Sequence, residues 1–186
     1  MGIRPHCLLA VFLAAGVARA QEPGPWSIGL ALNAKLDWPN PLTTGLFYFP
    51  FSVRVAREWT KHLRVRGSLG YGTIFGDETS GSTLEALVAP EARGCTSLAC
   101  AAARVNVGFS SSSYHWQGRT AEIRAVLIEP AFAFSFPGET RFGFGFELGW
   151  RFKLPVWRRI VAVDRVGPTE GNQTGPLLGL FLELRL

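Results

Sequence analysis

The chain is poor in cysteine, histidine and clustered charge, and each shortage argues against a class of function. Among 186 residues there are three cysteines and three histidines, and no second Cys or His pair lies near Cys95 and Cys100. A zinc site is therefore not expected. The formal net charge is +5, but basic residues are scattered and the longest basic run is Arg158-Arg159. Nucleic-acid-binding proteins gather such residues in patches, so we do not expect a nucleic acid as partner. The sequence also gives no sign of a metal or a cofactor.

Long apolar runs are also missing after the first twenty residues. A short polar start with Arg4 is followed by an almost unbroken apolar run, Cys7 to Val17, and then by the small residues of Ala18-Arg19-Ala20. This is the pattern of a cleaved secretory signal peptide, and the run is too short for a membrane-spanning helix. We predict a signal peptide over 1–20 and a single domain over 21–186. Because 47% of the chain is hydrophobic, its apolar side chains must be kept from water by a structure other than a spanning helix.

Export also bears on the two cysteines that remain after cleavage. Cys95 and Cys100 bound the short segment CTSLAC. A close pair in an exported protein is most simply a disulfide. The sequence therefore predicts a Cys95–Cys100 bridge.

Side-chain alternation with a period of two is the strongest pattern present. In the stretch from Ala131 to Leu154, two alternating segments flank the turn at 137–140. One face carries phenylalanine, leucine and tryptophan, and the other carries glycine, alanine, serine and charges. Strand side chains alternate between faces, so this stretch predicts a β-hairpin with one apolar face and one small or charged face.

The same alternation recurs in eight segments, which predicts eight strands. They are 26–37, 46–59, 63–75, 82–91, 103–109, 120–136, 141–154 and 175–186. Residues 82–91 also fit a short helix, because Leu84-Glu85-Ala86-Leu87 are helix formers. Tight turns at 60–62 and 137–140 alternate with longer connections at 38–45, 76–81, 110–119 and 155–174. Strands near ten residues long, with short turns on one side, are typical of transmembrane β-barrels.

The polar face favours a narrow barrel interior. It mixes small residues with charges of both signs, which can neutralise each other inside an eight-stranded barrel about wide enough for side chains to fill. We predict an interior charge network of Arg54, Arg64, Arg66, Arg104, Glu129, Glu147, Arg151, Glu183 and Arg185, with Glu85 and Lys153 on the same face. Such a filled interior excludes a large open pore.

Aromatic residues near the strand ends favour lipid against the apolar face. Trp26 and Trp59 lie toward one expected edge, whereas Trp38, Tyr71, Trp150 and Trp157 lie toward the other. Twelve steps from Trp26 to Trp38, at roughly 3.3 Å each and a tilt near 40°, rise about 30 Å. A soluble β-sandwich or lipocalin-like barrel, with its apolar faces packed inward, stays open as an alternative.

In size and pattern the chain resembles the small eight-stranded outer-membrane barrels of Gram-negative bacteria, of the outer membrane protein A and X type. Its closest match to a motif is the alternating end 179–186, although leucine stands where an aromatic residue is usual. The resemblance implies an all-β, antiparallel, up-and-down transmembrane barrel in the outer membrane. It also implies contacts with lipid, recognition of the last strand by the barrel-assembly machinery, and surface ligands bound through the loops 76–81, 110–119 and 155–174.

The role expected from this resemblance is structural, surface-interacting or that of a minor pore, without catalysis. Two alternatives stay open: an enzyme that modifies outer-leaflet lipid, and a soluble secreted β-barrel that binds an apolar ligand. The chain is similar in size and pattern to the lipid A deacylases, which use a His-x-Ser pair. Here the order is reversed in Ser113-x-His115, so these two residues are only weak catalytic candidates and a polar loop is the simpler interpretation.

Overall fold

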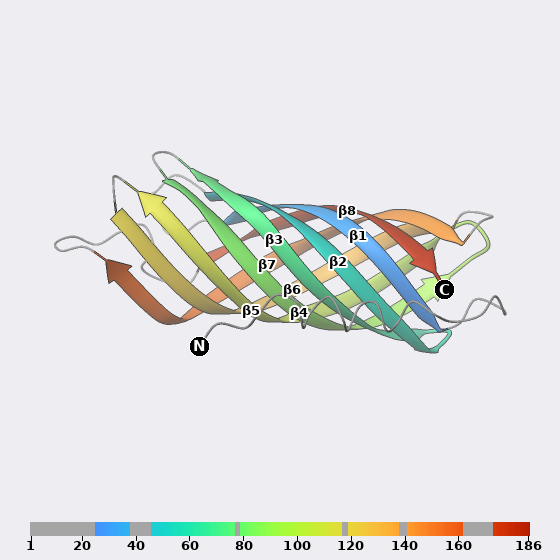
Figure 1. The fold of residues 1–186 in the computed structure, drawn as a ribbon. Coiled ribbons are helices and arrows are strands. Elements are labelled where there is room, and N and C mark those ends of the chain that lie inside the picture. The colour runs from blue at the N-terminus through green and yellow to red at the C-terminus, as the bar shows by residue number, and fades with distance from the viewer. Residues whose placement is uncertain (1–24, 38–45, 77–78, 117–118, 138–140, 162–172) are drawn as a thin grey trace.

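The computed structural model describes residues 25–37, 46–76, 79–116, 119–137, 141–161 and 173–186. Within them lie eight strands: β1 (Trp26–Asp37), β2 (Leu46–Thr60), β3 (Leu63–Gly76), β4 (Thr79–Cys95), β5 (Cys100–Trp116), β6 (Arg119–Pro137), β7 (Phe142–Val161) and β8 (Gln173–Arg185). Each strand pairs antiparallel with the next, and β1 pairs with β8 to close the barrel (Figure 1). The predicted all-β, eight-stranded, antiparallel up-and-down barrel is confirmed.

Residues 82–91, for which the sequence left strand and helix open, belong to β4. Their backbone pairs with β3 on one side, from Leu63↔Ala92 to Gly76↔Thr79, and with β5 on the other. Hydrogen bonding to two neighbours outweighs the weak helix propensity of this segment, because intrinsic propensity yields readily to tertiary context. Thr83, Glu85 and Glu91 point into the barrel, as the strand interpretation requires.

Three predicted connections are shorter than expected, and the prediction that 110–119 is a loop is wrong. Strand β5 continues to Trp116 and β6 begins at Arg119, while β7 runs on to Val161 and β8 begins at Gln173. The connection expected at 76–81 shrinks likewise, because β4 begins at Thr79. These strand ends lack the regular apolar alternation by which a strand is recognised in sequence. Residues 110–113 are all serine, and the β6–β7 register shifts between Arg124 and Ala125, opposite Val156.

The barrel is apolar outside and polar inside. Phe132 is 65% exposed and Phe144 59%, whereas Arg151 is fully buried. This orientation contradicts the soluble alternative, in which the apolar faces pack inward. None of the described residues forms a helix long and apolar enough to cross a membrane.

The apolar exterior forms a band that ends abruptly toward one end of the barrel. On β6 the outward residues are apolar from Phe136 to Val126, and Arg124 and Glu122 follow. Ten steps at roughly 3.3 Å and a tilt near 40° give about 25 Å, the height of the lipid-facing band of outer-membrane barrels. The first row beyond the band runs across neighbouring strands and ends in an aromatic residue on each side: Tyr71, Leu84, Ser111, Arg124 and Trp157.

The opposite end carries the short turns and both ends of the described chain. The β2–β3 turn is closed by the Thr60 hydroxyl oxygen, which accepts from the backbone N–H groups of His62 and Leu63. Trp26 and Trp59 are exposed at this end, and the Arg57 guanidinium lies over the Trp26 ring at 5.3 Å. The predicted signal peptide, Trp38 and residues 138–140 and 162–172 lie outside the described residues.

Candidate functional site in the barrel interior

Every strand contributes a charged side chain to the interior. The inward positions follow from strand alternation, and the closed barrel aims all of them at one axis. The contributing residues, in strand order, are Lys35, Arg54, Arg64 and Arg66, Glu85 and Glu91, Arg104, Glu129, Glu147, Arg151 and Lys153, and Glu183. A charge that is buried without a partner is costly. We therefore describe which of these side chains pair with one another.

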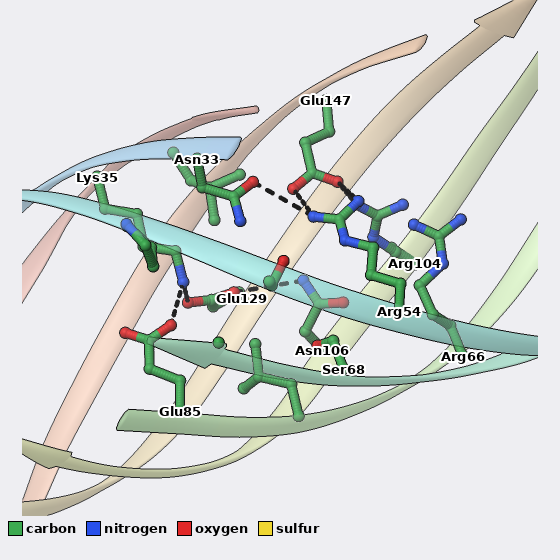
Figure 2. A pocket seen from close by; sticks show the side chains of 15 residues that line it. Asn33, Lys35, Arg54, Arg66, Ser68, Glu85, Arg104, Asn106, Glu129 and Glu147 are labelled. Atoms are coloured by element: carbon green, nitrogen blue, oxygen red, sulfur yellow. Dashed lines mark hydrogen bonds and ion pairs between the residues drawn. The ribbon is translucent and has the colours of Figure 1, made fainter. Parts of the chain in front are cut away.

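One cluster balances two cations against two carboxylates. The Lys35 ammonium lies 2.6 Å from Glu85 and 2.8 Å from Glu129. The Arg151 guanidinium donates to the same Glu85 at 2.6 Å and approaches Glu129 at 3.7 Å. The two contacts of Lys35 join β1 to β4 and β6 across the interior, strands with which β1 shares no backbone hydrogen bonds (Figure 2). Arg151 adds β7 to the cluster.

A second cluster is built on four arginines. Arg54 donates to both oxygens of Glu147, at 2.9 and 2.6 Å, and Arg104 pairs with the same carboxylate. Glu91 accepts from Arg64 and also pairs with Arg66 at 2.9 Å and Arg104 at 3.3 Å. A final pair closes the cluster against β8: Arg64 lies 2.5 Å from Glu183.

One aromatic ring contacts two of these arginines. Phe181 is 5% exposed and points into the barrel, and the guanidinium groups of Arg54 and Arg66 lie 5.5 and 5.6 Å from its ring centroid. Contacts of this kind attract a cation to the ring face. The sequence pattern gave no sign of this role, because interior aromatics depart from the division of apolar and polar faces.

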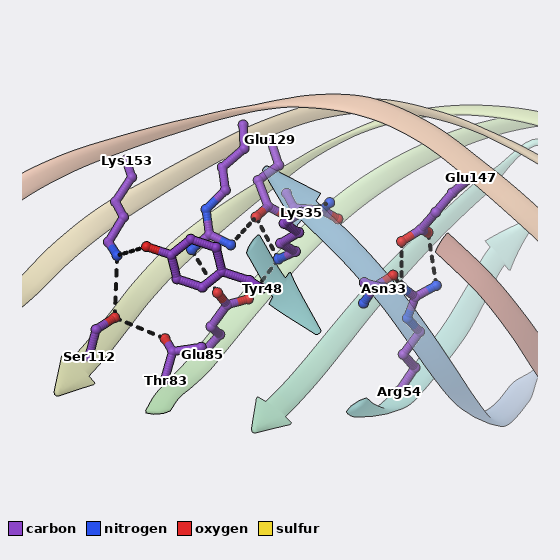
Figure 3. A network of polar contacts seen from close by, with 12 residues as sticks. Asn33, Lys35, Tyr48, Arg54, Thr83, Glu85, Ser112, Glu129, Glu147 and Lys153 are labelled. Atoms are coloured by element: carbon purple, nitrogen blue, oxygen red, sulfur yellow. Dashed lines mark hydrogen bonds and ion pairs between the residues drawn. The ribbon is translucent and has the colours of Figure 1, made fainter. Parts of the chain in front are cut away.

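Toward the end beyond the apolar band the interior becomes hydroxyl-rich. The Lys153 ammonium donates to the Tyr114 hydroxyl at 2.6 Å, and the Tyr48 and Tyr114 hydroxyls lie 2.9 Å apart. Figure 3 shows the further contacts of Lys153 with Ser112 at 3.3 Å and with the Tyr48 hydroxyl at 3.5 Å. Thr83 continues the chain to Ser112 at 3.0 Å. Tyr48 and Ser112 were missed as interior contacts, because the sequence offers no cue to partners on distant strands.

The packed side chains leave almost no free volume on the barrel axis. The cavity between the two clusters measures about 20 Å³ and is lined by residues such as Arg54, Arg66, Glu85 and Asn106. A cavity needs roughly 10–15 Å³ to hold one water, so this cavity has room for one water molecule or one ion of similar size. A larger hollow of about 510 Å³ lies by the outer wall, among Trp59, Pro90, Val105 and Phe132. The interior therefore has no room for an apolar ligand.

Among the nine network residues predicted from sequence, eight form ion pairs and Arg185 forms none with the described residues. Arg185 lies on the inward face at the end of β8 but stays partly exposed, so water can solvate it. Lys35 and Glu91 were not included in the predicted network, although alternation places both on the polar face. Glu91 contacts three arginines and proves central.

Within the described strands, Ser113 and His115, the weak catalytic candidates, are not hydrogen-bonded to each other. Both point outward from β5 beyond the apolar band, and the His115 ring nitrogen Nδ1 lies 3.3 Å from the Thr120 hydroxyl instead. No hydrogen bond joins the two among the described residues, whereas a nucleophile and its base need one. Across the described ranges, no group of three or more His, Cys, Asp or Glu side chains could hold a metal ion.

The disulfide predicted between Cys95 and Cys100 is present. It joins the last residue of β4 to the first residue of β5, which face each other in the antiparallel register. The Thr96 hydroxyl oxygen accepts from the backbone N–H groups of Leu98 and Ala99 in the same turn. This end of the hairpin is thus fixed covalently as well as by hydrogen bonds.

No family model and no curated protein matches the sequence. Solved structures do match in fold. Neisserial surface protein A and Ail, the attachment invasion locus protein of Yersinia pestis, each give a TM-score of 0.58 at 10% identity, over 89% of this chain and 100% of theirs. The N-terminal β-barrel domain of OprF from Pseudomonas aeruginosa gives 0.52 at 10% identity, over 88% and 100%. The chain shares the fold of these small eight-stranded outer-membrane barrels.

Proposed function

We propose that the protein is an integral outer-membrane protein of a Gram-negative bacterium with a structural or surface-interaction role. The observation that carries this proposal is the continuous apolar exterior of a closed barrel with a charged interior. A closed barrel leaves no unpaired strand edge, which is the condition for β-structure to span lipid. Soluble monomers rarely expose contiguous apolar patches beyond a few hundred Å², so lipid is the natural cover for this band.

The proposed orientation follows from the lengths of the connections. In outer-membrane barrels the short turns face the periplasm, which places the β2–β3 turn and the disulfide-closed β4–β5 turn on that side. The opposite end then projects from the outer leaflet. Its outer wall is polar and combines Ser82, Ser113, Glu122 and Arg159 in one cross-strand row. We propose that this wall, with the connections above it, carries any contact with a surface ligand.

A pore role is the weaker form of the proposal. The cavity of about 20 Å³ on the axis is too small for a sugar, and widening it into a channel would require several buried ion pairs to separate together. We expect liposomes that contain the protein to show no swelling in small sugars, in contrast to liposomes that contain a porin. Swelling at a comparable rate would contradict a closed interior.

Partners inside the membrane follow from the same exterior. Acyl chains would cover the band and could enter the hollow near Trp59. We further propose that the assembly machinery recognises β8, whose residues Leu178, Leu180 and Leu182 are exposed on the outer face. These leucines stand in place of the aromatic residues usual in such strands.

Membrane fractionation tests the proposal directly. We expect the native protein in the outer-membrane fraction, resistant to carbonate extraction and soluble only with detergent. Its migration in gel electrophoresis should change on heating, because a folded barrel and an unfolded chain differ in size. Recovery of the folded protein in the periplasm without detergent would overturn the proposal.

A further inference from the structure

Three arginines converge on the small cavity in the barrel axis. Arg54, Arg66 and Arg104 all line it and come from three strands, β2, β3 and β5. Figure 2 shows their guanidinium groups close together on one side, away from Lys35 and Glu85. Like charges gathered in a space closed to solvent repel one another unless anions lie between them.

The carboxylates around these arginines do not balance them. With Arg64, the cluster holds four guanidinium groups, and its contacts lead to three carboxylates, Glu91, Glu147 and Glu183. One positive charge remains in excess, whereas the cluster of Lys35, Arg151, Glu85 and Glu129 is neutral. An excess charge that is nearly inaccessible to water is costly without a counterion.

Arg66 carries the excess most directly. It is 4% exposed, and its Nη2 lies 2.9 Å from Glu91, a carboxylate that two other arginines share, and 3.9 Å from Glu183, which Arg64 holds at 2.5 Å. Its Nη1 has no hydrogen-bond partner among the described residues. Arg54, by contrast, donates two hydrogen bonds to Glu147. A guanidinium group offers five N–H donors, so Arg66 retains donors for a further acceptor.

A second spare donor lines the same cavity. The Ser52 hydroxyl is buried and has no hydrogen-bond partner within the described part of the chain. In the β2–β3 register Ser52 faces Gly70 and Arg66 faces Ala56, so the two donors reach the cavity from different levels of the barrel. A cavity of about 20 Å³ holds one particle the size of a water molecule, which suits a halide and excludes sulfate or phosphate.

We infer that the barrel interior binds one small monovalent anion, of chloride size, between Arg66, its neighbouring arginines and Ser52. The anion neutralises the excess charge of the arginine cluster and accepts from the spare donors. The site is independent of where the barrel resides, because it depends only on the closed interior.

Anion-dependent stability tests the site. Unfolding of the detergent-folded protein would be followed in urea at constant ionic strength while sodium chloride replaces sodium gluconate, whose anion is too large for the cavity. A ligand that binds only the folded state raises the folded-to-unfolded ratio about tenfold for each tenfold increase above its dissociation constant. Wild-type protein and Arg57→Gln, which removes an exterior charge, should show this rise. Arg66→Gln should not.

Two outcomes would overturn the site: equal stability of the wild type in chloride and gluconate, or the same chloride dependence in Arg66→Gln as in Arg57→Gln. If Arg66→Gln fails to fold, anomalous diffraction from wild-type crystals grown in bromide tests whether an anion occupies the cavity. A bromide peak beside Arg66 supports the site. An interior without a peak in well-ordered crystals refutes it.

Discussion

At the scale of single residues, shared carboxylates hold the interior together. Glu91 contacts Arg64, Arg66 and Arg104, and Glu147 contacts Arg54 and Arg104. A buried pair is weak evidence for net stability, because desolvation can cancel its attraction. Removal of one shared partner is a different matter, since it leaves several buried charges uncompensated.

Glu91→Gln should therefore be strongly destabilising. We expect the free energy of unfolding to fall by about 3–5 kcal/mol, the usual result of breaking a buried pair, measured by urea titration in detergent. Glu58→Gln is the matched control, because Glu58 pairs with Arg93 at the rim and its side chain is 29% exposed. Its cost should stay below about 1 kcal/mol. Equal losses in both variants would contradict the central role of Glu91.

Gly179 makes room for the Glu147 carboxylate. A Cβ atom at this position would lie 2.6 Å from Cγ of Glu147 and closer still to the Asn33 amide oxygen. Gly179→Ala should displace Glu147 from Arg54 and cost about 1–3 kcal/mol, as overpacking does. Gly67→Ala is the control, because nothing lies within 4 Å of its Cβ. Thermal or urea unfolding of the two variants makes the comparison, and identical midpoints would show that the interior accommodates the methyl group.

At the scale of elements, the β4–β5 hairpin combines a covalent clamp with a long ladder. Its register runs from Cys95↔Cys100 to Thr79↔Trp116 and is interrupted at Pro90, which has no N–H to donate. The disulfide closes a very short loop that the ladder already brings together. Its contribution to stability should accordingly be modest.

Replacement of both cysteines by serine should leave the barrel folded. Loop-closure entropy for so short a loop amounts to about 2 kcal/mol at most, and the paired strands reduce the effect further. Urea unfolding of the double variant would measure the loss. Thiol labelling of the unreduced, denatured wild type should find neither Cys95 nor Cys100 reactive, and labelling of both would show that the bridge does not form.

At the scale of the whole molecule, the apolar band separates two kinds of exposed surface on the same strand. Val105 is 41% exposed within the band, and Ser111, three positions further along the same face of β5, is exposed beyond it. In water the two positions would be equivalent. In a bilayer they differ, because only one of them faces hydrocarbon.

Arginine at these two positions tests the bilayer placement. Val105→Arg should lower the free energy of unfolding in lipid vesicles by about 2–4 kcal/mol, the usual cost of a lipid-facing arginine near the bilayer midplane. Ser111→Arg should change stability by less than about 1 kcal/mol. Folding titrations in vesicles measure both, and equal effects would argue against the proposed position of the membrane.

Period-two alternation determined most of the strands that face the apolar band and the division between outward and inward residues. Local chemistry suffices there, because each such strand separates apolar from polar positions. The close cysteine spacing in an exported chain predicted the Cys95–Cys100 bridge. Only the tertiary structure decided that 110–116 and 155–161 are strands, because these segments lack regular alternation and are held by pairing with neighbouring strands. It also decided the interior pairs. Lys35 meets Glu85, and Phe181 contacts Arg54 and Arg66, through the register of eight strands, which no single segment encodes.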